Sequence, residues 1–143
     1  MSKRRTIIIV AMTLVAVAAA LVLITQSAKR QAESMACGNY VASIGCAALL
    51  WATDRDDHLP PDLLSMSDEL IATKILICPG DHSRQPAPSW AAFTPADSSY
   101  EIVTPGLRMT DTNGVFLRCK IHGHLGYADA TVFDGVRRRT KIQ

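Results

Sequence analysis

The chain has one long uncharged stretch near its N-terminus, and this stretch limits what the chain can fold into. No charged residue and no histidine occurs from Thr6 to Ala28. As a helix, residues 6–24 would be about 28 Å long, close to the hydrocarbon layer of a bilayer at about 30 Å. Thr6 and Thr13 do not forbid insertion, because a hydroxyl in a helix can bond to the preceding turn. The stretch therefore predicts a transmembrane helix over residues 6–26.

A cleaved secretory signal peptide is the alternative interpretation of this stretch. Such a peptide has an apolar region of about 7–15 residues, followed by small residues at the cleavage site. Here the apolar run is longer, and Thr25 and Gln26 stand where a small residue is needed. We therefore expect an uncleaved anchor in contact with membrane lipid.

The charges on either side of the apolar run predict its orientation. Residues 1–5 form a basic tip that ends in Lys3, Arg4 and Arg5, and positive residues stay on the cytoplasmic side. This predicts a single-pass protein of the inner (cell) membrane, with its C-terminal part in the periplasm or extracytoplasmic space. Of the fifteen Lys and Arg residues, three lie in the tip, leaving twelve against thirteen Asp and Glu. This near-neutral balance gives no reason to expect nucleic-acid binding.

After the apolar stretch, the helical pattern continues as an amphipathic segment over residues 27–57. Its apolar residues recur at steps of three and four, which places them on one face of a helix. This packing face consists of Cys37, Val41, Ile44, Ala48 and Trp51. Residues 58–143 then read as a small domain with short segments and turns. We expect an extended piece at 74–79 and strands at 99–103, 115–119 and 127–133. The predicted fold class is α+β, a long N-terminal helix packed on a small antiparallel sheet.

Two cysteine-histidine pairs, about forty residues apart, are the main candidates for chemistry. Cys78 is followed by His82, and Cys119 is followed by His122. Thiolate and imidazole are the preferred ligands of zinc, and both spacings are workable for a chelate. The same cysteines could instead form a disulfide. The residues alone allow both, and the redox state of the compartment decides between them.

An extracytoplasmic location favours the disulfide. Cys78 and Cys119 each border an extended segment and a loop, which makes them the likeliest partners, and closing this loop would contribute about 4 kcal/mol in the chain-entropy model. Cys37 and Cys46 point to opposite sides of the predicted helix, so they cannot pair with each other. We therefore expect no cofactor, with zinc at Cys78, His82, Cys119 and His122 as the alternative. No catalytic motif is present, and we expect a protein that is not an enzyme.

Several short motifs together resemble those of the type IV pilin and type II secretion pseudopilin superfamily. They are Cys37–Asn39 with Ile44 and Gly45 on the helix, Ile77–Asp81 as an "ICPxD" loop, and Cys119–Gly123 as a "C-x-x-H-G" turn. His124 with Asp134 and Gly135 also fits an "H-x9-DG" signature, although the turn at Tyr127–Val132 is an alternative register. The resemblance implies a pilin-like fold for most of the chain after residue 35.

One departure from this family affects the expected function. The family carries a glycine before the apolar run and a glutamate within it, and neither is present here. A buried glutamate would be costly in a bilayer and therefore functional, so its absence argues against the filament contact of major subunits. The resemblance implies a membrane-anchored, pseudopilin-like structural or assembly protein. Its partners would be other pseudopilin-like or secretion-apparatus subunits. The alternative function is a membrane-tethered zinc module.

Overall fold

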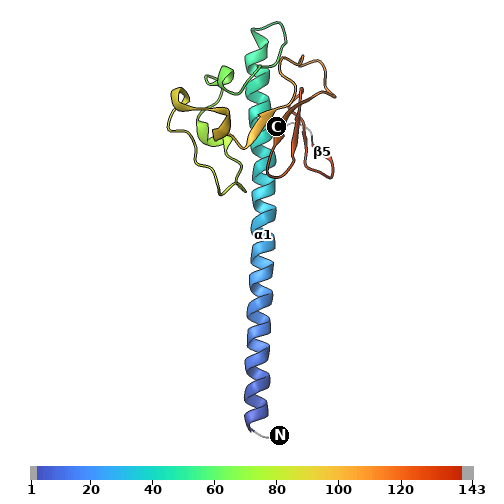
Figure 1. Ribbon diagram of the computed structural model, residues 1–143. Helices are drawn as coiled ribbons and strands as arrows, with labels where there is room; N and C mark the ends of the chain where they lie inside the picture. Colours follow the sequence, from blue (N-terminus) through green and yellow to red (C-terminus); the bar gives the residue numbers. More distant parts are fainter. Residues whose placement is uncertain (1–2, 140–143) are drawn as a thin grey trace. The chain divides into compact units, whose positions relative to one another are not determined.

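A computed structural model describes residues 3–139 of the chain. It contains one long helix, α1 (Lys3–Thr53), and a five-stranded sheet (Figure 1). The chain divides into two compact units, Met1–Ala32 and Glu33–Gln143. The fold class is α+β, as the sequence predicts. Residues 1–2 of the predicted basic tip and residues 140–143 of the predicted C-terminal domain lie outside the described residues.

The N-terminal unit consists of the first part of α1, and its apolar side chains are exposed. This helix is long and apolar enough to cross a membrane, and none of its most apolar window is buried by the protein. The hydroxyl of Thr13 donates to the carbonyl oxygen of Val10 at 2.8 Å, as expected for a hydroxyl in an apolar helix. Thr25 bonds to Val22 in the same way at 2.9 Å. The unit is thus compatible with a single membrane span.

In the second unit, the C-terminal part of α1 provides the centre of the hydrophobic core. Four residues of the predicted packing face are buried, and Trp51 is half-buried. The other buried positions of this part of α1 are small residues: Ala42, Gly45, Ala47 and Ala52. Small side chains let neighbouring segments approach the helix closely. Because a helix that is apolar on more than one side must be covered on more than one side, loops and sheet both pack against it.

The helix ends at Thr53, four residues before the end of the predicted amphipathic segment. Asp56 and Asp57 adopt positive φ angles of 52° and 62°, which a right-handed helix does not allow. The N–H of Asp57 bonds to the carbonyl oxygen of Ala52 at 3.3 Å and thereby closes the last turn. Asp residues tolerate the left-handed region better than most residues, so they suit a helix end.

The sheet is antiparallel, and its strands follow one another in chain order. The strands are β1 (Tyr100–Ile102), β2 (Val115–Cys119), β3 (Leu125–Tyr127), β4 (Val132–Phe133) and β5 (Arg138–Arg139). In Figure 1 they lie beside the cyan part of α1. Glycines make the contact close, because a Cβ atom at Gly126 of β3 would lie 2.9 Å from Cγ1 of Val41. The sheet thus rests directly on the helix that carries Cys37.

Four 3-10 helices connect α1 to the sheet. They are η1 (Leu64–Met66), η2 (Thr73–Leu76), η3 (Trp90–Ala92) and η4 (Pro95–Asp97). The strands predicted at 99–103 and 115–119 are confirmed as β1 and β2. The extended piece predicted at 74–79 is wrong over its first half, which belongs to η2. The single strand predicted at 127–133 is also wrong, because Ala130 takes a φ of 60° in a turn between β3 and β4.

Candidate metal centre

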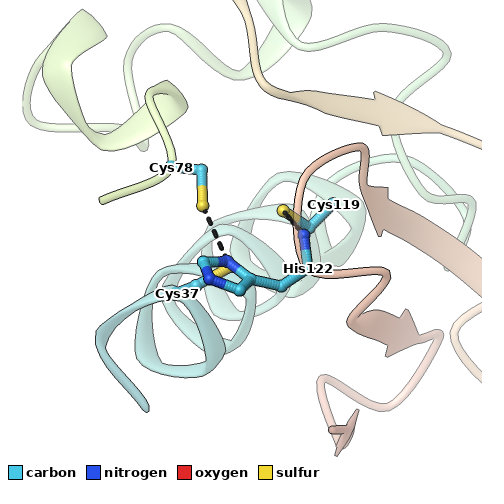
Figure 2. A group of neighbouring side chains, drawn as sticks. All are labelled: Cys37, Cys78, Cys119 and His122. Atoms are coloured by element: carbon cyan, nitrogen blue, oxygen red, sulfur yellow. Dashed lines mark hydrogen bonds between the residues drawn. The ribbon is translucent and has the colours of Figure 1, made fainter. Parts of the chain in front are cut away.

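Four side chains from three separate parts of the chain meet in the second unit (Figure 2). Cys37 lies on α1, Cys78 follows η2, Cys119 ends β2, and His122 lies in the turn between β2 and β3. The three sulfur atoms and one imidazole nitrogen all lie within 4.8 Å of one another. The cysteines are at most 1% exposed, and His122 is half-buried. This is the set of atoms from which a metal site can be built.

The loop that carries Cys78 is held by the carboxylate of Asp81. The backbone N–H of Asp81 bonds to the carbonyl oxygen of Cys78 at 2.8 Å, which makes a tight turn. The carboxylate accepts hydrogen bonds from the hydroxyls of Ser83 at 2.6 Å and Ser99 at 2.7 Å, and it pairs with Arg84. Since Ser99 directly precedes β1, these contacts fix the Cys78 loop to the sheet.

The turn between β2 and β3 brings Cys119 and His122 to the same place. The N–H of Gly123 bonds to the carbonyl oxygen of Cys119 at 3.0 Å, and Gly123 has a φ of 69°, a region that glycine adopts without strain. Within this turn, the N–H groups of Ile121 and His122 both point at the sulfur of Cys119, at 3.4 Å. If β2 continued straight, Cys119 and His122 would lie far apart. The turn instead brings both residues to the same site.

The imidazole of His122 is positioned by close packing against Gly80 and His124. Its Nδ1 lies 3.1 Å from the sulfur of Cys78. A Cβ atom at Gly80 would lie 2.6 Å from its Cε1, so the ring occupies space that only a glycine leaves free. The ring of His124 stacks on it with centroids 5.5 Å apart, and Nε2 of His124 lies 3.2 Å from the hydroxyl of Ser34 on α1.

Each of the three sulfur atoms also has a hydrogen-bond donor besides the other members of the group. The hydroxyl of Tyr100 donates to Cys37 at 3.7 Å, and the N–H of Gly80 donates to Cys78. Cys119 receives the two N–H groups described above. Donors of this kind stabilise a thiolate, whether it is free or bound to a metal. Each sulfur thus has a neighbouring donor that can stabilise negative charge if the thiol ionises.

The pKa values of the three thiols differ, because burial and the hydrogen bonds within the group act on them unequally. A hydrogen bond from Cys37 lowers the pKa of Cys119 most, and the N–H groups of His122 and Ile121 lower it further against the opposing effect of burial. The same hydrogen bond, together with burial, raises the pKa of Cys37. Burial is the main cause that raises the pKa of Cys78. The three thiols therefore differ in how readily each loses its proton, and a bound cation would displace the protons that remain.

The donor set fits zinc better than other common metals. Three thiolates and one imidazole form one of the usual tetrahedral structural sites, with Zn–S distances of about 2.3 Å. Such bonds place sulfur atoms about 3.8 Å apart, so the present separations of up to 4.8 Å need only a small contraction. All four positions are filled by protein atoms, and no position stays open for a substrate. Four protein ligands are typical of structural zinc sites.

The structure brings together three of the four residues of the alternative zinc set. Cys78, Cys119 and His122 belong to the group, but His82 does not. The side chain of His82 is 68% exposed, and its Nε2 pairs with Glu33 at 3.4 Å. The fourth ligand is Cys37, which the sequence places only on the packing face of the helix. The sequence shows only that Cys37 is a cysteine at a buried helical position. Its spacing does not relate it to the two cysteine-histidine pairs later in the chain.

The cysteines are not joined to one another in the structure. Cys78 and Cys119 both have free thiols, and their sulfurs lie in one group. The disulfide expected between them stays a prediction. Cys37 is buried and Cys46 is exposed, in keeping with opposite sides of the helix.

Comparisons with protein-family models, with curated proteins and with solved structures find no match to this chain.

Proposed function

We propose that the protein is a membrane-tethered zinc-binding module. The observation that carries this proposal is the meeting of Cys37, Cys78, Cys119 and His122 within 4.8 Å. Zinc at this point would connect α1, the Cys78 loop and the β2–β3 turn. Since a structural zinc site contributes its binding free energy to folding, the metal would hold the sheet on the helix. The protein has no catalytic role in this proposal.

The N-terminal part of α1 would supply the tether. It is apolar, exposed and long enough to span a bilayer. The basic residues before the apolar run favour a cytoplasmic N-terminus, which would leave the zinc-binding unit in the periplasm or extracytoplasmic space at the inner (cell) membrane. Metal ligation would then have to compete with oxidation of the three thiols in that compartment.

Metal analysis of the purified full chain tests the proposal. The protein is solubilised in detergent under reducing conditions, loaded with zinc and freed of excess metal. We expect one zinc ion per chain. His122→Ala should lower the affinity for zinc by at least tenfold, because it removes a ligand, whereas His82→Ala and Cys46→Ser should retain the wild-type affinity. Absence of bound zinc, or equal losses for His82→Ala and His122→Ala, would refute the proposal.

A pseudopilin-like structural or assembly role is the second candidate, and the arrangement of α1 favours it. A helix that carries an exposed apolar segment and then packs against an antiparallel sheet has the order of parts expected from the resemblance. Its partners would be other pseudopilin-like or secretion-apparatus subunits.

Cysteine crosslinking in the native membrane tests this second role, because Cys46 is exposed on α1. A photoreactive crosslinker coupled to Cys46 through a maleimide should join it to a neighbouring pilin-like subunit, and Cys46→Ser should abolish the product. If only uncrosslinked chain is recovered at saturating reagent, the assembly role is wrong. The zinc-binding proposal would be unaffected by that result.

A further inference from the structure

The candidate metal centre contains an odd number of thiols. Cys37, Cys78 and Cys119 come from three different segments, and their sulfurs all lie within 4.8 Å of one another. A disulfide requires an S–S distance of about 2.05 Å, so two of these sulfurs would have to move closer together to be joined. A disulfide would use two sulfurs and leave one thiol. Metal binding and disulfide formation therefore compete for the same atoms.

The contacts within the group favour one of the possible pairs. The side chains of all three cysteines are hydrogen-bonded within the group, so these bonds alone do not select a pair. The sulfur of Cys78 differs from the other two because it also lies 3.1 Å from Nδ1 of His122 (Figure 2). Two backbone N–H groups hold Cys119 in place from the other side. Cys37 is thus the natural partner of Cys119, and Cys78 is the residue left over.

We propose that the centre is a redox-sensitive metal site, in which oxidation joins Cys37 to Cys119 and releases the zinc ion. This inference rests on the proposed zinc-binding function and adds regulation to it. The pair differs from Cys78–Cys119, which the sequence favours. Because Cys37 lies on α1 and Cys119 ends β2, the disulfide would replace the metal as the link between helix and sheet.

The oxidant in this proposal is a peroxide. The sulfur of Cys119 attacks one peroxide oxygen, the O–O bond breaks, and a sulfenic acid and hydroxide form. The sulfur of Cys37 then attacks the sulfenic sulfur, the S–O bond breaks, and a second hydroxide leaves as the S–S bond forms. Two thiolates have lost two electrons, and the peroxide has been reduced to two hydroxide ions.

Loss of the zinc ion follows from the number of ligands that remain. Cys78 and His122 are only two protein ligands, whereas structural zinc sites use four. The three cysteines are at most 1% exposed, so a peroxide reaches their sulfurs only by local opening of the structure. A bound zinc ion would hold the three segments together, so the reaction should be slow in the zinc-bound state and faster after partial metal removal.

Oxidation of the zinc-loaded full chain in detergent tests the inference. Cys46→Ser serves as the background, because it removes the exposed thiol outside the group. Hydrogen peroxide is added, released zinc is followed with a chromophoric chelator, and thiols are counted after denaturation. We expect one zinc ion released per chain, a fall from three thiols to one, and a Cys37–Cys119 disulfide in the peptide map. A thiol reductant and fresh zinc should restore the starting state.

Two further variants on the Cys46→Ser background separate the possible pairs. Cys78→Ser should still form the disulfide and lose both remaining thiols, whereas Cys119→Ser should form little disulfide. Retention of zinc in peroxide, release without a disulfide, or a Cys78–Cys119 disulfide in the peptide map would overturn the inference. A protein that takes up no zinc before oxidation would instead refute the proposed function, so the two failures are distinguishable.

Discussion

The imidazole of His122 can lie beside the sulfurs because Gly80 has no side chain. A Cβ atom at this position would lie 2.6 Å from Cε1 and 3.0 Å from Nε2 of the ring. Gly80→Ala should therefore displace the ring and lower the affinity for zinc by about 10–100-fold, the usual effect of disturbing the groups around a metal ligand. A competition titration with a chromophoric chelator measures this change.

Gly38→Ala is the matched control for this prediction. Gly38 neighbours the ligand Cys37, but a Cβ atom there would meet His124 no closer than 3.8 Å, an ordinary contact. The variant should keep the wild-type affinity for zinc. Equal affinities of Gly80→Ala and Gly38→Ala would show that the ring of His122 does not bind the metal.

Asp81 makes the stability of the domain depend on pH. Burial raises its pKa, but hydrogen bonds from Ser83, Ser99 and Arg84 outweigh burial and hold the pKa well below its usual range. The folded state therefore favours the carboxylate. Its contribution is fully present above the ordinary pKa of about 3.9 and is lost as the pH falls through the lower folded-state pKa. Acidification below about pH 4 should thus destabilise the domain.

Asp81→Asn should remove this contribution. We expect a loss of about 2–3 kcal/mol in the free energy of unfolding at pH 7, because buried hydrogen bonds to a charged group are broken. The loss should shrink as the pH falls below 4. Urea unfolding from pH 3 to pH 7 measures it, with the exposed Asp111→Asn as the control. A pH-independent difference between Asp81→Asn and the wild type would contradict the assignment.

The site was predictable at the residue scale only where its ligands lie close together in the sequence. Cys119 and His122 share one tight turn, and Cys78 lies in a loop with its own turn, so spacing identified them. His82 also lies a few residues from a cysteine, but its side chain is exposed and pairs with Glu33. Cys37 comes from a helix about forty residues before Cys78. Only the packing of the helix on the sheet brings it to the others, and no local pattern records that contact.

At the scale of elements, the backbone of α1 approaches the turn between β3 and β4 closely, because only small residues lie between them. A Cβ atom at Gly45 would lie 3.0 Å from Cβ and 3.1 Å from Cα of Ala130. Ala130 cannot move easily, because its N–H bonds to Tyr127 at 2.9 Å and its φ of 60° is already unfavourable for alanine. Gly45→Ala should therefore destabilise the domain.

The expected change in stability for Gly45→Ala is the difference between two effects, the cost of overpacking and the gain in helix propensity. Overpacking costs about 1–3 kcal/mol, and alanine contributes about 1 kcal/mol over glycine in a helix. We expect a net loss of about 1 kcal/mol, whereas Gly38→Ala, which meets no close neighbour, should stabilise the domain by up to about 1 kcal/mol. Thermal unfolding of both variants measures the difference. A gain in stability for Gly45→Ala would show that the helix does not contact this turn so closely.

Periodicity predicted the elements that are long or that pair regularly, and it failed at the short ones. The apolar steps of three and four identified the buried side of α1, and β-branched and aromatic residues identified β1 and β2. η2 lies in an apolar run of only a few residues, where strand and helix look alike. The strand expected at 127–133 is interrupted by a left-handed alanine. Since alanine rarely adopts this conformation, the sequence gives no sign of the turn.

At the scale of the whole molecule, the proposed membrane attachment depends on the apolar segment of α1. Two arginines in its middle, Leu14→Arg and Ala18→Arg, should each raise the cost of insertion by about 2.5–3.5 kcal/mol. We expect the wild-type chain to remain in the membrane pellet after alkaline carbonate extraction and the double variant to be released. Leu14→Ile with Ala18→Val is the apolar control. Retention of the arginine variant would contradict the proposed span.

The α+β class of the whole molecule was predictable, because an apolar helical stretch followed by short strands leaves few other arrangements. The competition between metal and disulfide was also visible in the sequence, since it depends only on which residue types are present. Which atoms meet was not visible, because it depends on tertiary packing. The structure resolves this question by placing Cys37 beside Cys78, Cys119 and His122.

X-ray absorption at the zinc edge, on the zinc-loaded full chain, tests the central proposal most directly. A site built from Cys37, Cys78, Cys119 and His122 requires three sulfur atoms at about 2.3 Å and one nitrogen atom at about 2.0–2.1 Å. His122→Ala should remove the nitrogen contribution, and His82→Ala should leave the spectrum unchanged. A zinc ion surrounded mainly by oxygen and nitrogen, or a spectrum that changes with His82 and not with His122, would contradict the proposed metal centre.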